Sequence, residues 1–234
     1  MQRYFAVKKN GDYFCLSDDD FYHIKIVMRM KDIDLIEVVF DKQLYICKFV
    51  DNFNVLPISL VTNDTYIKRD VTIIVPLLKD TKMALILQKC TELGVKKIIV
   101  VMLSRCVVKV DGPAIERKLL RWKRIVKEAS EQAKRNEIPS IDYAWEINDL
   151  KVLDGKKLVC STIDKTISFK KTLKNIHIYD KINILMGPEG GLTLTEEQTL
   201  VTMGFIPVSL GNLIMRVETV PIFLLSVLNY ESME

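Results

Sequence analysis

The segment Leu185-Met186-Gly187-Pro188-Glu189-Gly190-Gly191-Leu192 decides the fold of this chain, and a second segment, Leu210-Gly211-Asn212-Leu213-Ile214-Met215-Arg216-Val217-Glu218-Thr219, follows about twenty residues later. Each follows an apolar, strand-like run and contains glycine, which permits backbone conformations or ligand approaches that a Cβ would block. Because open α/β sheets bind small molecules where strands give way to helices, the two segments together predict a ligand site. Alone, the Gly-Pro-Glu-Gly-Gly run could equally be an ordinary turn.

Short apolar runs alternate with stretches long enough for helices in the part of the chain around these two segments. The alternation predicts a mainly parallel α/β sheet. Thr193 and Glu196 form a capping-box pattern, so a helix is expected directly after the first glycine turn. A last helix is expected from near Glu218, with Pro221 in its first turn. The expected strands are 71–75, 98–103, 157–160, 182–186 and 207–210.

The first 70 residues have a different pattern, of short β segments with one helix. Leu35 to Phe40 and Gln43 to Phe49 flank Asp41-Lys42, which is the spacing of a tight hairpin, although this is not a favoured turn pair. Leu56 to Val61 predicts a further strand, and the carboxylates of 18–20 predict the start of a helix. These expected strands and the helix are consistent with a small β-barrel that carries one helix. The polar junction 63–70 predicts a domain boundary near residue 70, and therefore domains of residues 1–70 and 71–234.

Composition restricts the class of protein. With 234 residues, 49% of them hydrophobic and 27% charged, the chain can bury a sizeable core. Its apolar runs are shorter than the ~20 residues that span a bilayer, and the N-terminus begins no secretory segment, so a soluble cytoplasmic protein is expected. Five scattered cysteines and two histidines favour buried thiols and no metal site. Dinucleotide-binding and P-loop motifs are not found.

Positive charge is concentrated in one part of the chain. Residues 105–135 contain 10 Lys or Arg against 4 Asp or Glu, whereas residues 1–70 contain 10 against 11. Such a patch suits a nucleic-acid backbone, although a solvated helix face is the alternative. A helix over 113–135 would have an apolar stripe that includes Trp122, which is expected to be a core anchor. Its arginine stripe is the better candidate for RNA phosphates.

The two glycine segments, together with 82–95 (KMALILQKCTELGV) and 121–135 (RWKRIVKEASEQAKR), closely resemble the RsmE family of the SPOUT superfamily. The resemblance runs from Arg3-Tyr4-Phe5 to the last helix. That family uses S-adenosylmethionine to methylate N3 of a uridine in 16S ribosomal RNA. The resemblance implies a PUA-like RNA-binding β-barrel for residues 1–70 and a SPOUT domain for 71–234, knotted as a trefoil from about Cys160 onward.

The resemblance supports Arg216, Glu218 and Glu189 as functional positions, and the chemistry of uridine N3 predicts their roles. Arg216 is expected to stabilise negative charge on the uracil, while Glu218 or Glu189 removes the proton or orients Arg216. The structural alternative is that Glu218 only caps the last helix. The backbone cradle for a bent S-adenosylmethionine would comprise Leu185, Met186, Gly187, Gly190, Gly191, Leu210, Gly211, Ile214, Met215 and Thr219.

The expected partners are 16S ribosomal RNA, free or in the small ribosomal subunit, and a second copy of the chain. The family is homodimeric through the last helix, although the apolar face of that helix could instead serve the monomer core. The RNA-binding residues are expected to be Arg3, Arg29, Lys82, Lys89, Arg121, Arg124 and Arg135.

The chain departs from the family pattern at several positions. Leu213 replaces an arginine in the second glycine segment, and Lys134 replaces a glycine in the segment 131–135. Two alternative functions stay open. One is a different SPOUT chemistry, such as ribose 2′-O methylation, and the other is a non-catalytic RNA-binding protein of ribosome assembly.

Overall fold

The computed structural model describes residues 1–31, 34–50, 54–62, 69–164 and 166–233. Residues 63–68 of the predicted polar junction and Asp32 lie outside the described residues. The chain divides into two compact units, which we call unit 1 (residues 1–66 and 128–138) and unit 2 (residues 67–127 and 139–234). Segment 128–138, distant in sequence, therefore belongs to the N-terminal unit. Among the described residues, no helix is long and apolar enough to cross a membrane.

Unit 1 is built on a six-stranded sheet with the order β1-β4-β5-β6-β3-β2. β1 is parallel to β4, and the remaining neighbours are antiparallel. The predicted hairpin is confirmed, and Asp41 and Lys42 both have positive φ (48° and 62°), as a type I′ turn requires. The strands are β1 (Arg3–Phe5), β2 (Lys8–Asn10), β3 (Tyr13–Cys15), β4 (Leu35–Phe40), β5 (Gln43–Phe49) and β6 (Asn54–Val61).

The helix of unit 1 begins at the predicted carboxylates but changes type after one turn. α1 (Asp18–Tyr22) is capped by Ser17, which forms a capping box with Asp20, and continues as the π-helix η1 (His23–Val27). Beyond η1 the chain turns at Arg29, whose φ is +52°. Most non-glycine residues avoid this region, so the turn holds Arg29 in an uncommon backbone conformation.

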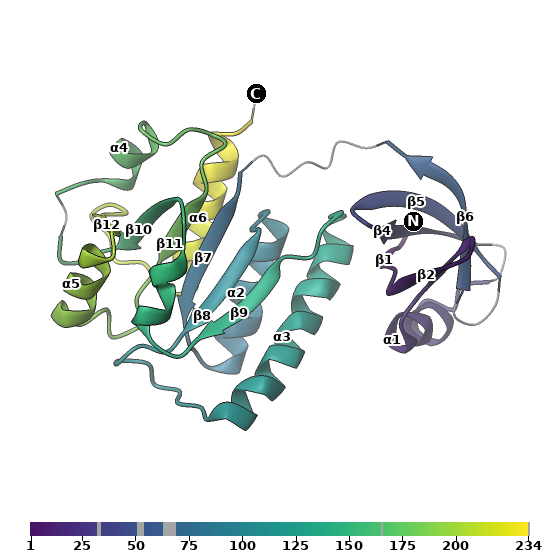
Figure 1. The fold of residues 1–234 in the computed structure, drawn as a ribbon, viewed down its shortest axis with the longest axis horizontal. Helices are drawn as coiled ribbons and strands as arrows, with labels where there is room; N and C mark the ends of the chain where they lie inside the picture. The colour runs from purple at the N-terminus through teal and green to yellow at the C-terminus, as the bar shows by residue number, and fades with distance from the viewer. Residues whose placement is uncertain (32–33, 51–53, 63–68, 165, 234) are drawn as a thin grey trace. The chain divides into compact units, whose positions relative to one another are not determined.

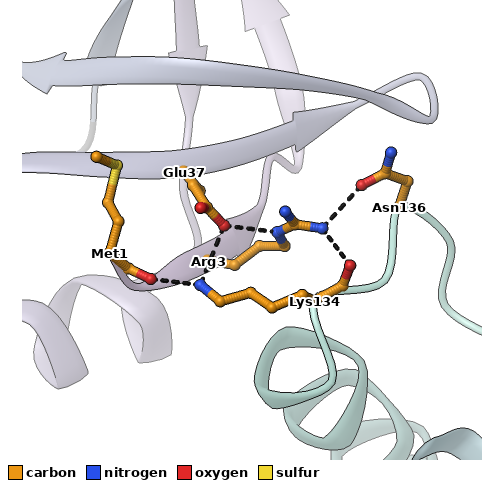
Figure 2. A network of polar contacts seen from close by, with 5 residues as sticks. All are labelled: Met1, Arg3, Glu37, Lys134 and Asn136. Atoms are coloured by element: carbon orange, nitrogen blue, oxygen red, sulfur yellow. Dashed lines mark hydrogen bonds and ion pairs between the residues drawn. The ribbon is translucent and has the colours of Figure 1, made fainter. Parts of the chain in front are cut away.

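A network of ion pairs and hydrogen bonds joins β1 to segment 128–138 within unit 1 (Figure 2). Arg3 is only 3% exposed; its Nε donates to Glu37 at 2.8 Å, and its Nη1 donates to the carbonyl oxygen of Lys134 and to Asn136. Lys134 in turn donates through Nζ to Glu37 at 3.0 Å and to the carbonyl oxygen of Met1. Burial alone would raise the pKa of Glu37, but the bonds from Arg3 and Lys134 hold it below its ordinary value. The carboxylate is therefore the centre of this network.

Unit 2 contains a six-stranded sheet with the order β12-β10-β11-β7-β8-β9, in which each neighbouring pair is parallel. The prediction of a mainly parallel sheet is confirmed. Five strands lie where the apolar runs predicted them, but the edge strand β9 was not predicted. The strands are β7 (Val71–Pro76), β8 (Lys97–Val101), β9 (Ser140–Ala144), β10 (Lys156–Cys160), β11 (Ile182–Leu185) and β12 (Ile206–Val208).

The long helix α3 confirms the predicted division into two stripes. Its residues Ile115, Trp122 and Val126 are at most 4% exposed, so Trp122 is a core anchor as predicted. The neighbouring helices α2 and α6 pack against each other, and Leu224, Leu225 and Leu228 of α6 are buried in the core of unit 2 (Figure 1). The helices of unit 2 are α2 (Asp80–Glu92), α3 (Gly112–Gln132, with 128–132 in unit 1), η2 (Ile147–Val152), α4 (Phe169–Leu173), α5 (Leu194–Thr202) and α6 (Thr219–Tyr230).

Lys134 combines an unfavourable backbone conformation with a favourable side-chain contact, and the two effects can be separated. Its φ of +58° lies in the left-handed region, where glycine is favoured. We predict that Lys134→Ala and Lys134→Gly both lose the ion pair with Glu37, but that the alanine variant is less stable by about 1 kcal/mol because it keeps the strained φ. Urea denaturation of both variants measures the difference, and equal stabilities would contradict a strained Lys134.

Candidate functional site

A cavity of about 620 Å³ lies where three parallel strands of unit 2 end. β12, β10 and β11 are neighbours in the sheet (Figure 1), and the residues that follow them line the cavity. These lining segments are 160–163 after β10, 186–192 after β11 and 210–218 after β12. Carboxyl ends of adjacent parallel strands are where open α/β sheets bind ligands. Both glycine segments of the sequence therefore meet in one cavity.

The first glycine turn is folded back tightly on itself. Gly191 has a φ of +70° and donates to the carbonyl oxygen of Pro188 at 2.8 Å. A Cβ on Gly187 would lie 3.0 Å from the amide nitrogen of Leu192, so only glycine fits there without a shift of the backbone. The backbone of this turn is therefore closely packed where it lines the cavity.

Arg105 supports the same turn from outside. Its Nη1 donates to the carbonyl oxygens of Gly190 (2.7 Å) and Leu192 (3.2 Å). The predicted capping box of Thr193 and Glu196 is confirmed at the start of α5, and Glu196 also accepts from the amide of Ser104 at 2.7 Å. Arg105 was not predicted from the sequence. The available signal was its place just after β8, at the same edge of the sheet.

The second glycine segment is anchored at both ends and exposed in the middle. Val217 is buried, whereas Leu213 and Ile214 are 85% and 83% exposed. Gly211 needs its glycine for conformation rather than for space, because its φ is +119° and a Cβ would meet no atom within 4 Å. The segment ends at Glu218, which occupies the N-cap position of α6 without a capping hydrogen bond from its side chain. Glu218 thus lies at the start of the last helix, where the structural alternative places it, and its role stays a prediction.

Lys82 of α2 lies between two of the predicted catalytic carboxylates. Its Nζ donates to Glu189 Oε1 at 2.9 Å and lies 3.5 Å from Glu218 Oε2. Burial alone would raise the pKa of Glu189, but the hydrogen bond and the charge of Lys82 hold it below its ordinary value. Arg216 is exposed and lines the same cavity. The cavity thus combines two cations with the carboxylates of Glu189, Glu197 and Glu218.

Most of the predicted cofactor-binding and catalytic residues lie together in this lining, with two exceptions. Leu185 is fully buried in the core at the end of β11, and Thr219 is the first residue of α6 and is not part of the lining. The predicted residues that do line the cavity are Met186, Gly187, Glu189, Gly190, Gly191, Leu210, Gly211, Ile214, Met215, Arg216 and Glu218.

Two of the three predicted RNA-binding residues of unit 1 are buried. Arg3 is buried in the network of Figure 2, and Arg135 is 6% exposed, with burial lowering the pKa of its guanidinium to about 10. A buried guanidinium that is hydrogen-bonded within the protein has a structural role and is not available to bind a phosphate. Arg29, in contrast, is exposed at the turn after η1, so its guanidinium is accessible to a phosphate.

Of the predicted RNA-binding residues of unit 2, the two arginines are exposed and the two lysines are half-buried, and both lysines and Arg121 are in ion pairs. Arg121 pairs with Asp80 at 3.0 Å, and Lys89 pairs with Glu92 at 2.8 Å. Arg124 is exposed on α3. Lys82 lines the cavity described above and is paired with carboxylates there, unlike a surface lysine that contacts phosphate. In the described part of the chain, no group of three or more His, Cys, Asp or Glu side chains could hold a metal ion.

Comparison with known proteins shows the family of this chain. A family model described as an RNA methyltransferase domain matches residues 65–229, which places unit 2 in that class of protein. The chain is 33% identical to ribosomal RNA small subunit methyltransferase E of Mesomycoplasma hyopneumoniae, covering 97% of this chain and 98% of the relative. It is 30% identical to the Bacillus subtilis protein of the same name, covering 99% and 97%.

A solved structure supports the same relationship. The ribosomal RNA small subunit methyltransferase E of Neisseria gonorrhoeae, bound to S-adenosyl methionine, matches with a TM-score of 0.87 at 26% identity, covering 99% of this chain and 98% of that one. The chain belongs to the RsmE family, the ribosomal RNA small subunit methyltransferases E. The resemblance found in the glycine segments is thereby confirmed.

Proposed function

We propose that this protein transfers the methyl group of S-adenosylmethionine to N3 of a uridine in 16S ribosomal RNA. The observation that carries the proposal is the single cavity in which the two glycine segments bring Glu189, Arg216 and Glu218 together. Family membership supports the reaction class, because the relatives are named small subunit methyltransferases and the Neisseria relative has S-adenosyl methionine bound.

The cavity fits this cofactor in size and in charge. A volume of about 620 Å³ lies within the ~300–1,000 Å³ typical of small-molecule sites. S-adenosylmethionine carries a sulfonium, an ammonium and one carboxylate, so its net charge is positive. The lining has three carboxylates and two cations and is therefore complementary. The backbone of 187–191 and 210–215 would hold the adenosine part, because exposed amides and carbonyls can recognise an adenine edge without a fixed side chain.

The reaction requires that uridine N3 lose a proton and that charge on the uracil be stabilised. When bound, S-adenosylmethionine supplies an electrophilic methyl group on a good leaving group. The guanidinium of Arg216 would stabilise the negative charge that develops on the uracil oxygens. Glu218 would accept the N3 proton, with Glu189 as the second carboxylate of the site. Positioning of the two reactants supplies much of the remaining rate enhancement.

Both units would contribute to recognition of the RNA. Unit 1 would be a PUA-like RNA-binding domain, in which exposed Arg29 contacts the RNA, and unit 2 a SPOUT domain with a C-terminal trefoil knot. The exposed Arg121 and Arg124 of α3 would contact phosphates. The half-buried Ile222 and Phe223 of α6 would belong to the interface of a homodimer. The protein would act in the cytoplasm, where its ribosomal substrate is.

The reaction is tested by transfer of labelled methyl groups from S-adenosylmethionine to small ribosomal subunits that lack this modification, followed by nucleoside analysis. We predict 3-methyluridine with the wild-type protein. Arg216→Ala should lower the rate by about 10²–10³, the cost of removing one donor that stabilises transition-state charge, with cofactor affinity retained. Lys174→Ala, an exposed cation outside the cavity, is the control. A different methylated nucleoside would overturn the proposed base specificity.

Cofactor binding is tested separately at the first glycine turn. We predict that Gly187→Ala weakens S-adenosylmethionine at least about tenfold, or ~1.4 kcal/mol, because the new Cβ would press against the amide of Leu192. Gly112→Ala is the matched control, since a Cβ there meets no atom within 4 Å. Isothermal titration calorimetry gives both dissociation constants. Unchanged affinity in Gly187→Ala would show that the turn does not form the cofactor site.

A further inference from the structure

We propose that Lys82 is a positioning residue of this site, which holds Glu189 and Glu218 in place and does not contact RNA phosphate. This inference rests on the proposed methyl-transfer function and deepens it. It reassigns a residue that sequence reasoning placed among the RNA contacts.

The geometry joins three segments that are far apart in the sequence. Lys82 is in the first turn of α2, Glu189 is in the glycine turn after β11, and Glu218 is the N-cap residue of α6. The Nζ of Lys82 lies 2.9 Å from Glu189 Oε1 and 3.5 Å from Glu218 Oε2. One ammonium group therefore fixes both carboxylates relative to each other and to the cavity wall.

Burial makes this cation necessary for Glu218. The side chain of Glu218 is 18% exposed, and its Oε2 atom is buried without a hydrogen-bond partner among the described residues. An ionised oxygen removed from water is costly unless a cation or a donor compensates it. Lys82 supplies that charge at 3.5 Å. Lys82 is therefore the cation that compensates this buried oxygen.

Other charged groups surround the site, but Lys82 is the cation that pairs with both carboxylates. Arg216 and Glu197 line the same cavity, and the charge of Lys79 acts on Glu189 in addition to that of Lys82. The hydrogen bond to Glu189 raises the pKa of Lys82, so the ammonium keeps its charge throughout neutral pH. A cation already paired with two carboxylates offers a phosphate little net attraction.

The test compares Lys82→Met, Lys82→Arg and the control Lys181→Met, which removes a cation paired with Asp154 at 3.1 Å outside the cavity lining. For Lys82→Met we expect kcat at neutral pH to fall about tenfold or more. The acid limb of the pH–rate profile should also shift upward by about one pH unit, because a carboxylate without its cation keeps its proton to higher pH. KM for the ribosomal subunit should not change, and Lys82→Arg should restore both kcat and the pH profile.

A second readout does not depend on methyl transfer. Carbon-13 NMR of labelled glutamate follows the titration of Glu189, whose resonance is assigned with Glu189→Gln. The midpoint should move upward in Lys82→Met and should stay near the wild-type value in Lys82→Arg and Lys181→Met. An unmoved midpoint, or a Lys82→Met defect confined to KM for the RNA substrate, would overturn the positioning role. If the midpoint moves but the wild-type protein transfers no methyl group, the proposed function fails while the role of Lys82 in ionising Glu189 stands.

Discussion

The whole site depends on the parallel pairing of β12, β10 and β11 as neighbours in one sheet. Parallel strands end at the same edge, so the three segments that follow these strands must come together there. β11 is buried along its whole length, and Leu158 and Val159 of β10 and Val208 of β12 are buried with it, so packing helps to fix the order and register of the strands. The residues with chemical function lie just beyond the strand ends, where the backbone is released from the sheet. The rigid core therefore positions a site that consists of turns.

The turns are held by charged groups that reach across from neighbouring segments. Arg105 binds two carbonyl oxygens of the first glycine turn, and Lys82 binds the carboxylates at both sides of the cavity. Neither cation is fully buried, so each contact gives only a modest contribution to folding stability. Their larger effect is on geometry, because a catalytic group displaced by about 1 Å loses much of its rate enhancement. These side chains preorganise the site before any ligand binds.

Much of this could be predicted from local sequence, because the relevant physics is local. The strand runs, the capping box at Thr193 and the apolar stripe with Trp122 were all correct, since periodicity and capping depend on near neighbours. Edge strand β9 was missed, because only five residues with mixed burial signal it. The partners of Arg3, Lys82 and Arg105 are set by tertiary packing, which one sequence does not reveal.

Lys134 is a second residue whose structural role depends on tertiary contacts that the sequence does not reveal. The family pattern has glycine at this position, and the φ of +58° explains why glycine suits it. This chain accepts the strain and gains a side chain that contacts Glu37 and Met1 (Figure 2). The replacement of glycine by Lys134 is thus first of all a change in the internal structure of unit 1.

The central claim is that the two glycine segments form the binding site of the methyl donor. The most direct measurement is a crystal structure of the protein with S-adenosylmethionine. The account predicts electron density for the cofactor between segments 187–191 and 210–216, with Glu189, Arg216 and Glu218 around its reactive end. Density for the cofactor elsewhere, such as in the second cavity of about 570 Å³ that Trp145 lines, would contradict it.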